Sequence, residues 1–379
     1  MPTILPFDGK TDLLEFSQPL IESLRAGGLA VFPTETVYGV AALASDEAAV
    51  AKLLQAKGRG ENHPLALAIH DVEAAWDYAA DWSWLMQRLA KRLWPGPLTL
   101  VASCESEKSA VGQFPPAVQQ AVAPQGTVGL RCPAHPVLQT VLRELREPLV
   151  LSSANLSGQP AALDSEQAAS ALGDAVDFIV TDGKTELQDA STVVLVQDDR
   201  LKILREGVLK GRDLQRYASL FVLVVCTGNT CRSPMAEVLL KQKAAERLQC
   251  SVEQLSQRGV MIASAGVYAS DGSPASIEAV AAMRQRGLDL TMHHSQLLDQ
   301  ALVQSADLIL TLTASHRGAL LQQWPDAVAR TFVMGGEQDV DDPFGGPQTW
   351  YEQCAQQIDG YLQEWVSEIP WDRVAKVEA

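Results

Sequence analysis

At 379 residues the chain is longer than one hydrophobic core usually supports, so its length predicts two domains. Apolar residues make up 47% of the sequence and charged residues 20%, which excludes a disordered or low-complexity protein. Lys and Arg number 30 against 46 Asp and Glu, so the net charge of −16 excludes a broad nucleic-acid surface and leaves room for a local pocket that binds a small anion.

The six cysteines form no CxxC pair and no cluster with histidine, so their spacing predicts free thiols and no metal site. The sequence opens on "MPTILPFDGK" without a basic segment followed by a long apolar stretch, and the longest apolar run, "LFVLVVC", is too short to cross a bilayer. We therefore expect a protein of the reducing cytoplasm with no membrane partner.

The first half of the chain alternates helix-like segments with short apolar strands. The predicted strands are "LAVF", "PLALAI", "LTLVAS", "TVGLR", "PLVLSS", "DFIV" and "STVVLV". Many strands with few long helices predict a mixed-sheet α/β domain over residues 1–210. The strand pattern stops in the charged stretch 204–220, where we place the domain boundary.

Basic and small polar residues gather in the turns of this first half. Lys57 and Arg59 form a compact pair just before a strand, as a triphosphate site requires, and hydroxyls and an amide follow in glycine-containing turns. These further residues are Thr127, Arg131, Ser152, Ser153, Asn155, Ser191 and Arg205. Each alone is better explained by a surface ion pair or a loop cap, and neither a Walker motif nor GxGxxG is present.

As an ordered set, "PTETVYG", "KGR", "WPGPLT", "RCPAHP", "SSANLSG" and "STVV" resemble the YrdC-like L-threonylcarbamoyl-AMP synthase family over roughly residues 10–210. The resemblance implies that L-threonine, bicarbonate and ATP, with Mg²⁺ accompanying the ATP, form threonylcarbamoyl-adenylate for the t6A modification of tRNA. The downstream partner would be the tRNA threonylcarbamoyl transferase machinery. Threonine would be bound by Thr36, Arg131 and Ser191, and ATP by Lys57, Arg59, His63, Thr127, Ser153, Asn155 and Arg205.

The reaction implied for this domain joins two anions, because threonine carbamate must attack the α-phosphate. Lys57, Arg59 and Arg205 would offset that repulsion. His63 and Ala68 depart from the asparagine and histidine of some family members, which leaves the substrate contacts there open. The alternative is an RNA-binding or regulatory module that keeps the fold without synthesis, and the full set of substrate residues and the acidic charge argue against it.

Beyond residue 220, strands and helices alternate regularly. We expect strands at 221–225, 260–264, 307–312 and 331–334, and helices at 234–248, 274–286, 315–322 and 348–367. Four β/α units with short connections predict a doubly wound, four-stranded parallel sheet over residues 220–379, with ligands bound beyond the carboxyl ends of its strands.

The stretch "CTGNTCRS", residues 226–233, lies at such a strand end and leads into a helix. A helix amino terminus offers backbone donors and a partial positive charge, so we expect an anion here, with Arg232 closing on it and Ser233 capping the helix. The same groups should lower the pKa of Cys226 and hold it as an attacking thiolate. The alternative is a structural cysteine and arginine at an ordinary turn.

A phosphocysteine mechanism also requires a general acid for the leaving group. The acidic, turn-rich stretch "DVDDPFGGP", residues 339–347, follows the fourth strand and should reach the same sheet edge. Asp342, held by Pro343, is the candidate, although composition alone fits a solvated acidic loop equally well.

The loop, with "SAG" at 264–266, "LTASH" at 312–316 and Asp342-Pro343, resembles the low-molecular-weight phosphotyrosine phosphatase family over roughly residues 221–370. The resemblance implies Cys226 as nucleophile, Arg232 as phosphate ligand and Asp342 as acid, without a cofactor. The remaining phosphate-loop residues would be Thr227, Gly228, Asn229, Thr230, Cys231 and Ser233, the last stabilising the thiolate.

Thr230 bears on the substrate, because tyrosine-directed members of the family usually carry an aliphatic residue there. A threonine resembles the protein-arginine phosphatases, so we expect a phosphoarginine protein as substrate, with phosphotyrosine as the alternative. Arsenate reductases share the loop, but residues 285–315 contain no cysteine to relay electrons. The intact Cys226, Arg232 and Asp342 argue against a domain that only binds phosphoproteins.

Overall fold

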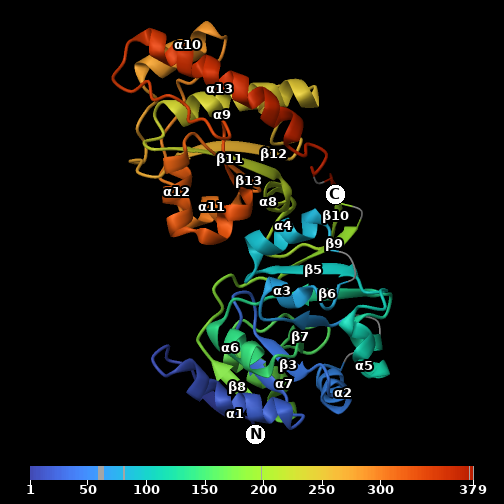
Figure 1. Cartoon of the computed structure of the whole chain (residues 1–379). Helices are drawn as coiled ribbons and strands as arrows, with labels where there is room; N and C mark the ends of the chain where they lie inside the picture. The colour runs from blue at the N-terminus through green and yellow to red at the C-terminus, as the bar shows by residue number, and fades with distance from the viewer. Residues whose placement is uncertain (59–63, 80–81, 198, 375, 379) are drawn as a thin grey trace. The chain divides into compact units, whose positions relative to one another are not determined.

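The structure is a computed structural model that describes residues 1–58, 64–79, 82–197, 199–374 and 376–378 (Figure 1). It divides into two compact units, the first formed by Met1–Tyr217 with a short terminal strand and the second by Ala218–Ala375. Among the described residues, no helix combines the length and apolar character that a membrane crossing requires.

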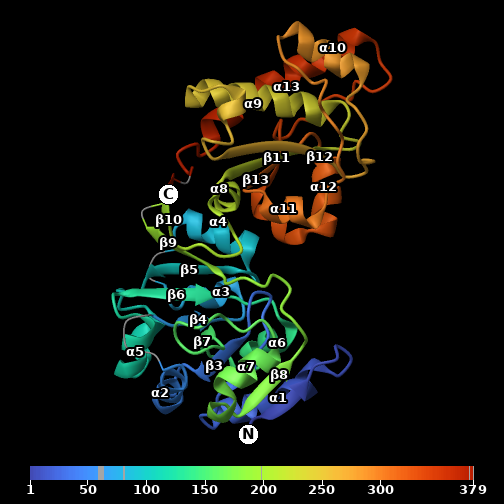
Figure 2. The ribbon, with the colours of Figure 1, turned by 180° about the vertical axis from the view of Figure 1, so that it is seen from behind.

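The first unit is built on a mixed sheet that has eleven strands within the described residues, in the order β1-β8-β2-β3-β7-β4-β6-β5-β9-β10-β15 (Figure 2). The strands are β1 (Thr3–Pro6), β2 (Ala30–Phe32), β3 (Gly39–Leu43), β4 (Ala66–Ala68), β5 (Leu98–Ser103), β6 (Thr127–Arg131), β7 (Leu149–Ser153), β8 (Phe178–Thr181), β9 (Thr192–Gln197), β10 (Arg200–Arg205) and β15 (Lys376–Glu378). The sheet contains both parallel and antiparallel pairs, so the predicted mixed-sheet fold is confirmed.

Helices connect and cover these strands. They are α1 (Leu13–Arg25), α2 (Glu47–Ala56), α3 (Val72–Ala75), α4 (Trp84–Leu93), α5 (Pro116–Val122), α6 (Pro136–Leu145), α7 (Ser165–Leu172) and α8 (Gly211–Ala218). Leu20, Leu24 and Leu138 are fully buried where α1 and α6 pack on β2, β3 and β7, and this apolar layer holds the strands whose ends carry the polar motifs.

The second unit is a four-stranded sheet in the order β12-β11-β13-β14, with every pair parallel. Its strands are β11 (Leu220–Cys226), β12 (Val260–Gly266), β13 (Leu308–Thr311) and β14 (Thr331–Val333). Its helices are α9 (Arg232–Leu248), α10 (Ile277–Gln285), α11 (Gln300–Ser305), α12 (Ala314–Gln323) and α13 (Gln348–Glu368).

Both faces of this sheet are covered by helices, because alternate residues of β11 point to opposite sides. Val222 and Val224 pack toward α9, α10 and α13, whereas Leu223 and Val225 pack toward α11 and α12 (Figure 1). The predicted doubly wound parallel sheet is therefore confirmed, and it places the end of β11 where a ligand site is expected.

Candidate functional site

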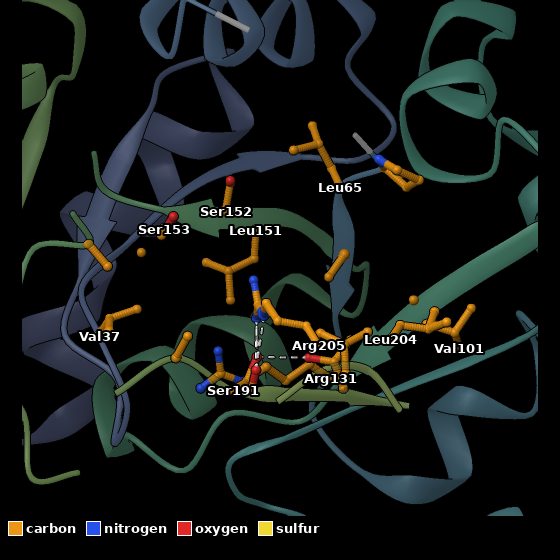
Figure 3. Close-up of a pocket in the computed structure, with 18 of the residues that line it drawn as sticks. Val37, Leu65, Val101, Arg131, Leu151, Ser152, Ser153, Ser191, Leu204 and Arg205 are labelled. Carbon is orange, nitrogen blue, oxygen red and sulfur yellow. Dashed lines mark hydrogen bonds between the residues drawn. The ribbon is translucent and has the colours of Figure 1, made fainter. Parts of the chain in front are cut away.

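A cavity of about 490 Å³ lies among strands β3 to β10 of the first unit (Figure 3). Its lining includes six of the residues that the sequence singled out as substrate ligands: Thr127, Arg131, Ser153, Asn155, Ser191 and Arg205. Apolar side chains such as Val37, Leu65 and Leu151 line it as well, together with further hydroxyl and amide groups. A pocket of this size, with apolar walls and convergent polar groups, has the character of a small-molecule site.

Lys57 ends helix α2 and is buried beneath the turn that follows β7. Its ammonium group donates to the carbonyl oxygen of Asn155 at 2.9 Å and to that of Ser153. A buried cation held by two carbonyls places positive charge directly behind this turn. Arg59 and His63, the other basic residues expected near the nucleotide, lie outside the described residues.

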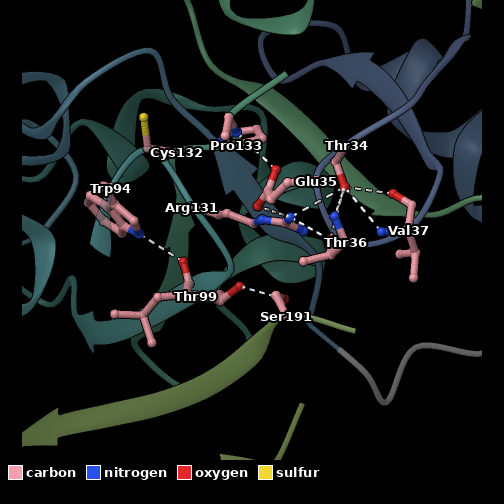
Figure 4. Close-up of polar contacts among 12 residues, drawn as sticks. Thr34, Glu35, Thr36, Val37, Trp94, Thr99, Arg131, Cys132, Pro133 and Ser191 are labelled. Carbon is pink, nitrogen blue, oxygen red and sulfur yellow. Dashed lines mark hydrogen bonds and ion pairs between the residues drawn. The ribbon is translucent and has the colours of Figure 1, made fainter. Parts of the chain in front are cut away.

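Arg131, the last residue of β6, lies in a buried polar cluster (Figure 4). Its Nη2 atom contacts the Glu35 carboxylate at 2.7 Å and the Thr36 hydroxyl at 2.6 Å. Glu35 also accepts from the backbone of Ala134 at 2.9 Å. Sequence reasoning named Thr36 and Arg131 but not Glu35, because the burial that makes a carboxylate need a cation partner is seen only in the folded chain.

Two residues lining the cavity keep buried polar atoms without a hydrogen-bond partner in the described part of the protein. They are Nε of Arg131 and Oδ1 of Asn155. Buried polar groups are normally satisfied, so an orphaned donor and acceptor at one cavity suit a polar ligand.

Ser191 directly precedes β9 and Arg205 ends β10, and the two residues meet at the cavity wall. Nη2 of Arg205 donates to the carbonyl oxygen of Ser191 at 2.8 Å and to its hydroxyl at 3.1 Å. That hydroxyl also lies 3.1 Å from the hydroxyl of Thr99, a residue that the sequence did not single out. Ala68, one of the two departures from the family pattern, is fully buried in β4.

In the second unit, Cys226 is the last residue of β11 and is 3% exposed. Its sulfur lies 2.9 Å from the Ser233 hydroxyl and accepts from the backbone N–H of Asn229 at 3.3 Å. A Cβ on Gly228 would meet only the Thr230 hydroxyl, at 3.8 Å, so the protein leaves the space beside this glycine open.

The position of Ser233 differs from the expected helix cap. Helix α9 begins at Arg232 with Cys231 as its N-cap, so Ser233 lies inside the first turn. Its hydroxyl contacts the cysteine sulfur and accepts from the side chain of Asn229 at 2.9 Å. The cap prediction was wrong because the loop closes two residues earlier than the Ser-Pro signal indicates.

The expected lowering of the Cys226 pKa is also wrong for this structure. Burial raises the pKa of the thiol, while the hydrogen bonds from Ser233 and Asn229 and the charge of Arg232 oppose that rise. Desolvation is the larger effect because almost no water reaches the sulfur.

Asn229 holds the loop in shape from its centre, with a left-handed φ of 52°. Its amide nitrogen donates to the hydroxyls of Ser233 and Ser264, at 2.9 and 2.8 Å, and its amide oxygen accepts from the backbone of Gln296 at 2.9 Å. Nε2 of His293 donates to the backbone carbonyl oxygen of Asn229 at 2.7 Å. The loop is therefore preorganised by the protein itself.

Arg232 and Asp342 are brought together as a buried guanidinium and a half-exposed carboxylate. Nη2 of Arg232 lies 2.7 Å from Oδ2 of Asp342, and Oδ1 of that aspartate accepts from the backbone of Phe344 at 3.2 Å. Asp342 thus reaches the same sheet edge as Cys226, as its place after β14 required.

His316, in the first turn of α12, was not singled out by the sequence as a site residue. Its Nε2 lies 2.8 Å from the hydroxyl of Thr227 in the phosphate loop. Burial, helped by the nearby charge of Arg232, lowers the pKa of His316 to about 4, so its imidazole is neutral at physiological pH.

Two family comparisons match these two units. Residues 22–207 match the Sua5, YciO and YrdC family described as "Telomere recombination", and residues 221–375 match the low molecular weight phosphotyrosine protein phosphatases.

Individual relatives fall into the same two groups. The threonylcarbamoyl-AMP synthase of Bacillus subtilis is 32% identical over 72% of this chain and 84% of its own length. A protein-arginine-phosphatase of Geobacillus stearothermophilus is 36% identical over 36% of this chain and 88% of its own length. A protein of Ralstonia solanacearum named as a probable low molecular weight protein-tyrosine-phosphatase is 35% identical over 39% of this chain and 94% of its own length.

Proposed function

Because the chain belongs to the Sua5/YrdC family over its first unit and to the low-molecular-weight protein phosphatase family over its second, we propose that it is a bifunctional enzyme. The first unit would make L-threonylcarbamoyladenylate from L-threonine, bicarbonate and ATP, and the second would hydrolyse phosphoarginine in proteins. We place both reactions in the cytoplasm, in keeping with six free cysteines, and assign the adenylate to the tRNA threonylcarbamoyl transferase machinery.

The observation that carries the synthase proposal is the gathering of six candidate ligands around one cavity of about 490 Å³. Bicarbonate and the threonine amine would give a carbamate and water. A carbamate oxygen would then attack the α-phosphorus of ATP, and the bond to the β-phosphate would break to release pyrophosphate. Arg131, Lys57 and Arg205 supply the positive charge that draws two anions together.

Magnesium would enter this cavity on the triphosphate. None of the described lining residues is acidic, and the described part of the chain holds no group of three His, Cys, Asp or Glu side chains suited to a metal. Mg²⁺ commonly binds substrate phosphates and keeps several waters, so such a lining fits the ion, which when bound would neutralise phosphate charge.

The synthase proposal predicts pyrophosphate release that depends on both ATP and threonine in bicarbonate buffer, and its loss in Arg131→Ala and in Arg59→Ala. Pyrophosphate release without threonine, or none from the wild type, would contradict the proposal. The control variant is Arg143→Ala, because this arginine lies on the exposed side of α6.

For the phosphatase, the carrying observation is the placement of the Cys226 sulfur, Arg232 and Asp342 at one strand edge. The thiolate would attack phosphorus, the bond from phosphorus to the leaving nitrogen would break, and Asp342 would donate the proton that the leaving guanidine takes. Water would then hydrolyse the phosphocysteine, with Asp342 as the base. Cys226→Ser should abolish this activity, and retained turnover would exclude the intermediate.

Phosphoarginine is the proposed substrate because, within the described residues, the hydroxyl of Thr230 has only a weak partner and can meet a polar leaving group. Its one described contact is with the sulfur of Cys231 at 3.7 Å, a weak partner. Phosphotyrosine is the second candidate, favoured by two exposed aromatic residues: Tyr268, whose backbone N–H donates to the carbonyl oxygen of Thr227, and Phe344, whose backbone N–H donates to Asp342. Comparing kcat/KM for phosphoarginine and phosphotyrosine peptides in wild type and Thr230→Ile tests the choice, and an unchanged preference would remove Thr230 from it.

A further inference from the structure

The segment 339–347, which carries Asp342, is held by one side chain of helix α13 at two points. Oε1 of Gln357 accepts from the backbone N–H of Asp341 at 3.0 Å, and its Nε2 donates to the carbonyl oxygen of Asp339 at 3.2 Å. Both halves of one amide group thus fix the backbone immediately before the candidate acid.

Two further residues of α13 touch the same segment. The thiol of Cys354 donates to the carbonyl oxygen of Asp341 at 3.5 Å, and because burial raises the pKa of this thiol to about 12, it keeps its proton at neutral pH. A Cβ on Gly346 would lie 2.6 Å from Cδ2 of Trp350, so the indole already fills the space over that glycine.

Residues 350, 354 and 357 are spaced four and three apart, which places them on one face of a helix. That face therefore holds the acid-bearing segment from its start at Asp339 to its end at Gly346. The opposite side of Asp342 meets Arg232 at 2.7 Å, so the carboxylate lies between the phosphate loop and the backbone that α13 anchors.

We propose that Gln357, supported by Cys354 and Trp350, is a positioning residue that sets where Asp342 stands relative to the leaving group. The inference rests on the proposed phosphatase function and adds a residue to it. A general acid works only within hydrogen-bond reach of the atom that it protonates. Loss of the hydrogen bond that fixes the backbone at Asp341 would therefore impair proton donation by Asp342 and leave the attack by Cys226 intact.

Leaving-group dependence separates these two effects. Phenyl phosphate releases a weakly acidic phenol and depends on the acid, whereas 2,4-dinitrophenyl phosphate releases a stable anion without it. In the full chain, Gln357→Met should lower kcat/KM for phenyl phosphate about tenfold and that for the dinitrophenyl ester less than about twofold, a fraction of the roughly hundredfold or greater effect expected of a general acid.

Three variants complete the experiment. Asp342→Asn should show the same selectivity more strongly. Gln357→Glu, which keeps the acceptor for Asp341 and loses the donor to Asp339, should fall between wild type and Gln357→Met. Gln356→Met makes the same change at an exposed neighbour on α13 and should behave as wild type.

Equal losses on both esters in Gln357→Met, while Asp342→Asn discriminates between them, would overturn the positioning role alone. If Asp342→Asn does not discriminate, or if the wild type hydrolyses neither the esters nor phosphoarginine peptides, the proposed mechanism itself fails. Thermal melts of each variant show whether a loss of activity is caused by unfolding. If Gln357→Met is unfolded, the comparison of Gln357→Glu with the wild type tests the positioning role instead.

Discussion

The hydroxyl of Ser233, 2.9 Å from the sulfur of Cys226, is the nearest group that eases ionisation of a buried thiol. Burial raises the pKa of Cys226 and this hydrogen bond lowers it. Ser233→Ala should therefore move the acidic limb of the kcat/KM profile to higher pH by about one to two units, since a hydrogen bond to a charged group is worth about 1.5–3 kcal/mol.

Two measurements check the Ser233 prediction. The pH dependence of kcat/KM and the rate of Cys226 alkylation by iodoacetamide should shift together, and Ser367→Ala at the far end of α13 should shift neither. An unchanged alkylation profile would mean that the hydroxyl does not interact with the thiolate.

His316 makes folding of the second unit pH-dependent. Its pKa is lowered from 6.5 to about 4. The unfolded chain therefore binds a proton at this histidine below pH 6.5, whereas the folded protein binds it only near pH 4. Stability is fully present above pH 6.5 and should fall by up to about 3 kcal/mol as the pH drops to 4.

Replacing this histidine isolates its contribution from that of the carboxylates. His316→Asn should lose less stability than wild type between pH 7 and pH 4.5, measured by hydrogen exchange of peptides from α12 and β13 in denaturant. Parallel losses in the two proteins would show that the imidazole is protonated in the folded state.

Site residues that lie together in one compact motif could be predicted from the sequence, whereas residues that interact across the fold could not. Cys226, Arg232 and the loop between them lie within eight positions of one another. Glu35 meets Arg131 from 96 residues away, and Gln357 reaches Asp341 from the next helix. Such pairings depend on strand order and helix facing, which no local pattern contains.

Among the elements, β12 and the phosphate loop approach each other closely at Gly266. A Cβ on Gly266 would lie 2.9 Å from the backbone nitrogen of Asn229 and 2.8 Å from Cβ of Ala269. Gly266→Ala must push the loop away from the strand, and a displacement near 1 Å costs roughly a hundredfold in rate.

Phosphatase kcat/KM of Gly266→Ala checks this expectation. Gly360→Ala, in α13 with nothing within 4 Å of the added carbon, is the matched control and should retain activity. Full activity in Gly266→Ala would show that the loop tolerates a shift relative to β12.

Apolar periodicity found most of the strands, and its failures have chemical causes. Strand β3 reads "GVAAL", whose glycine and alanines have weak strand preference, so it was missed although it is fully buried. Helix α11 is only six residues long, too short to show a period. The central strand β11 was recognised because its seven residues, all of which are buried, form one continuous apolar run in the sequence.

For the whole molecule, each candidate site draws its described residues from a single unit. The cavity uses residues between Thr34 and Arg205, and the phosphate site uses residues from Cys226 onward. Cys226→Ser should therefore abolish phosphatase activity and leave threonine-dependent pyrophosphate release within about twofold, and Arg131→Ala should do the reverse, because sites without shared partners behave independently. A loss above tenfold in the other activity would instead reveal coupling.

The pairing of β1 with β8 also governs the order in which the first unit is completed during synthesis. Thr3 pairs with Phe178, and β8 pairs on its other side with β2, so both amino-terminal strands wait for residues 178–181. At about 5–20 residues per second, translation takes on the order of ten seconds or more to pass from β2 to β8. A ribosome that stalls before that point leaves one edge of β2 unpaired, and an unpaired strand edge is a template for aggregation, so a chaperone that covers it would protect the nascent chain during that interval.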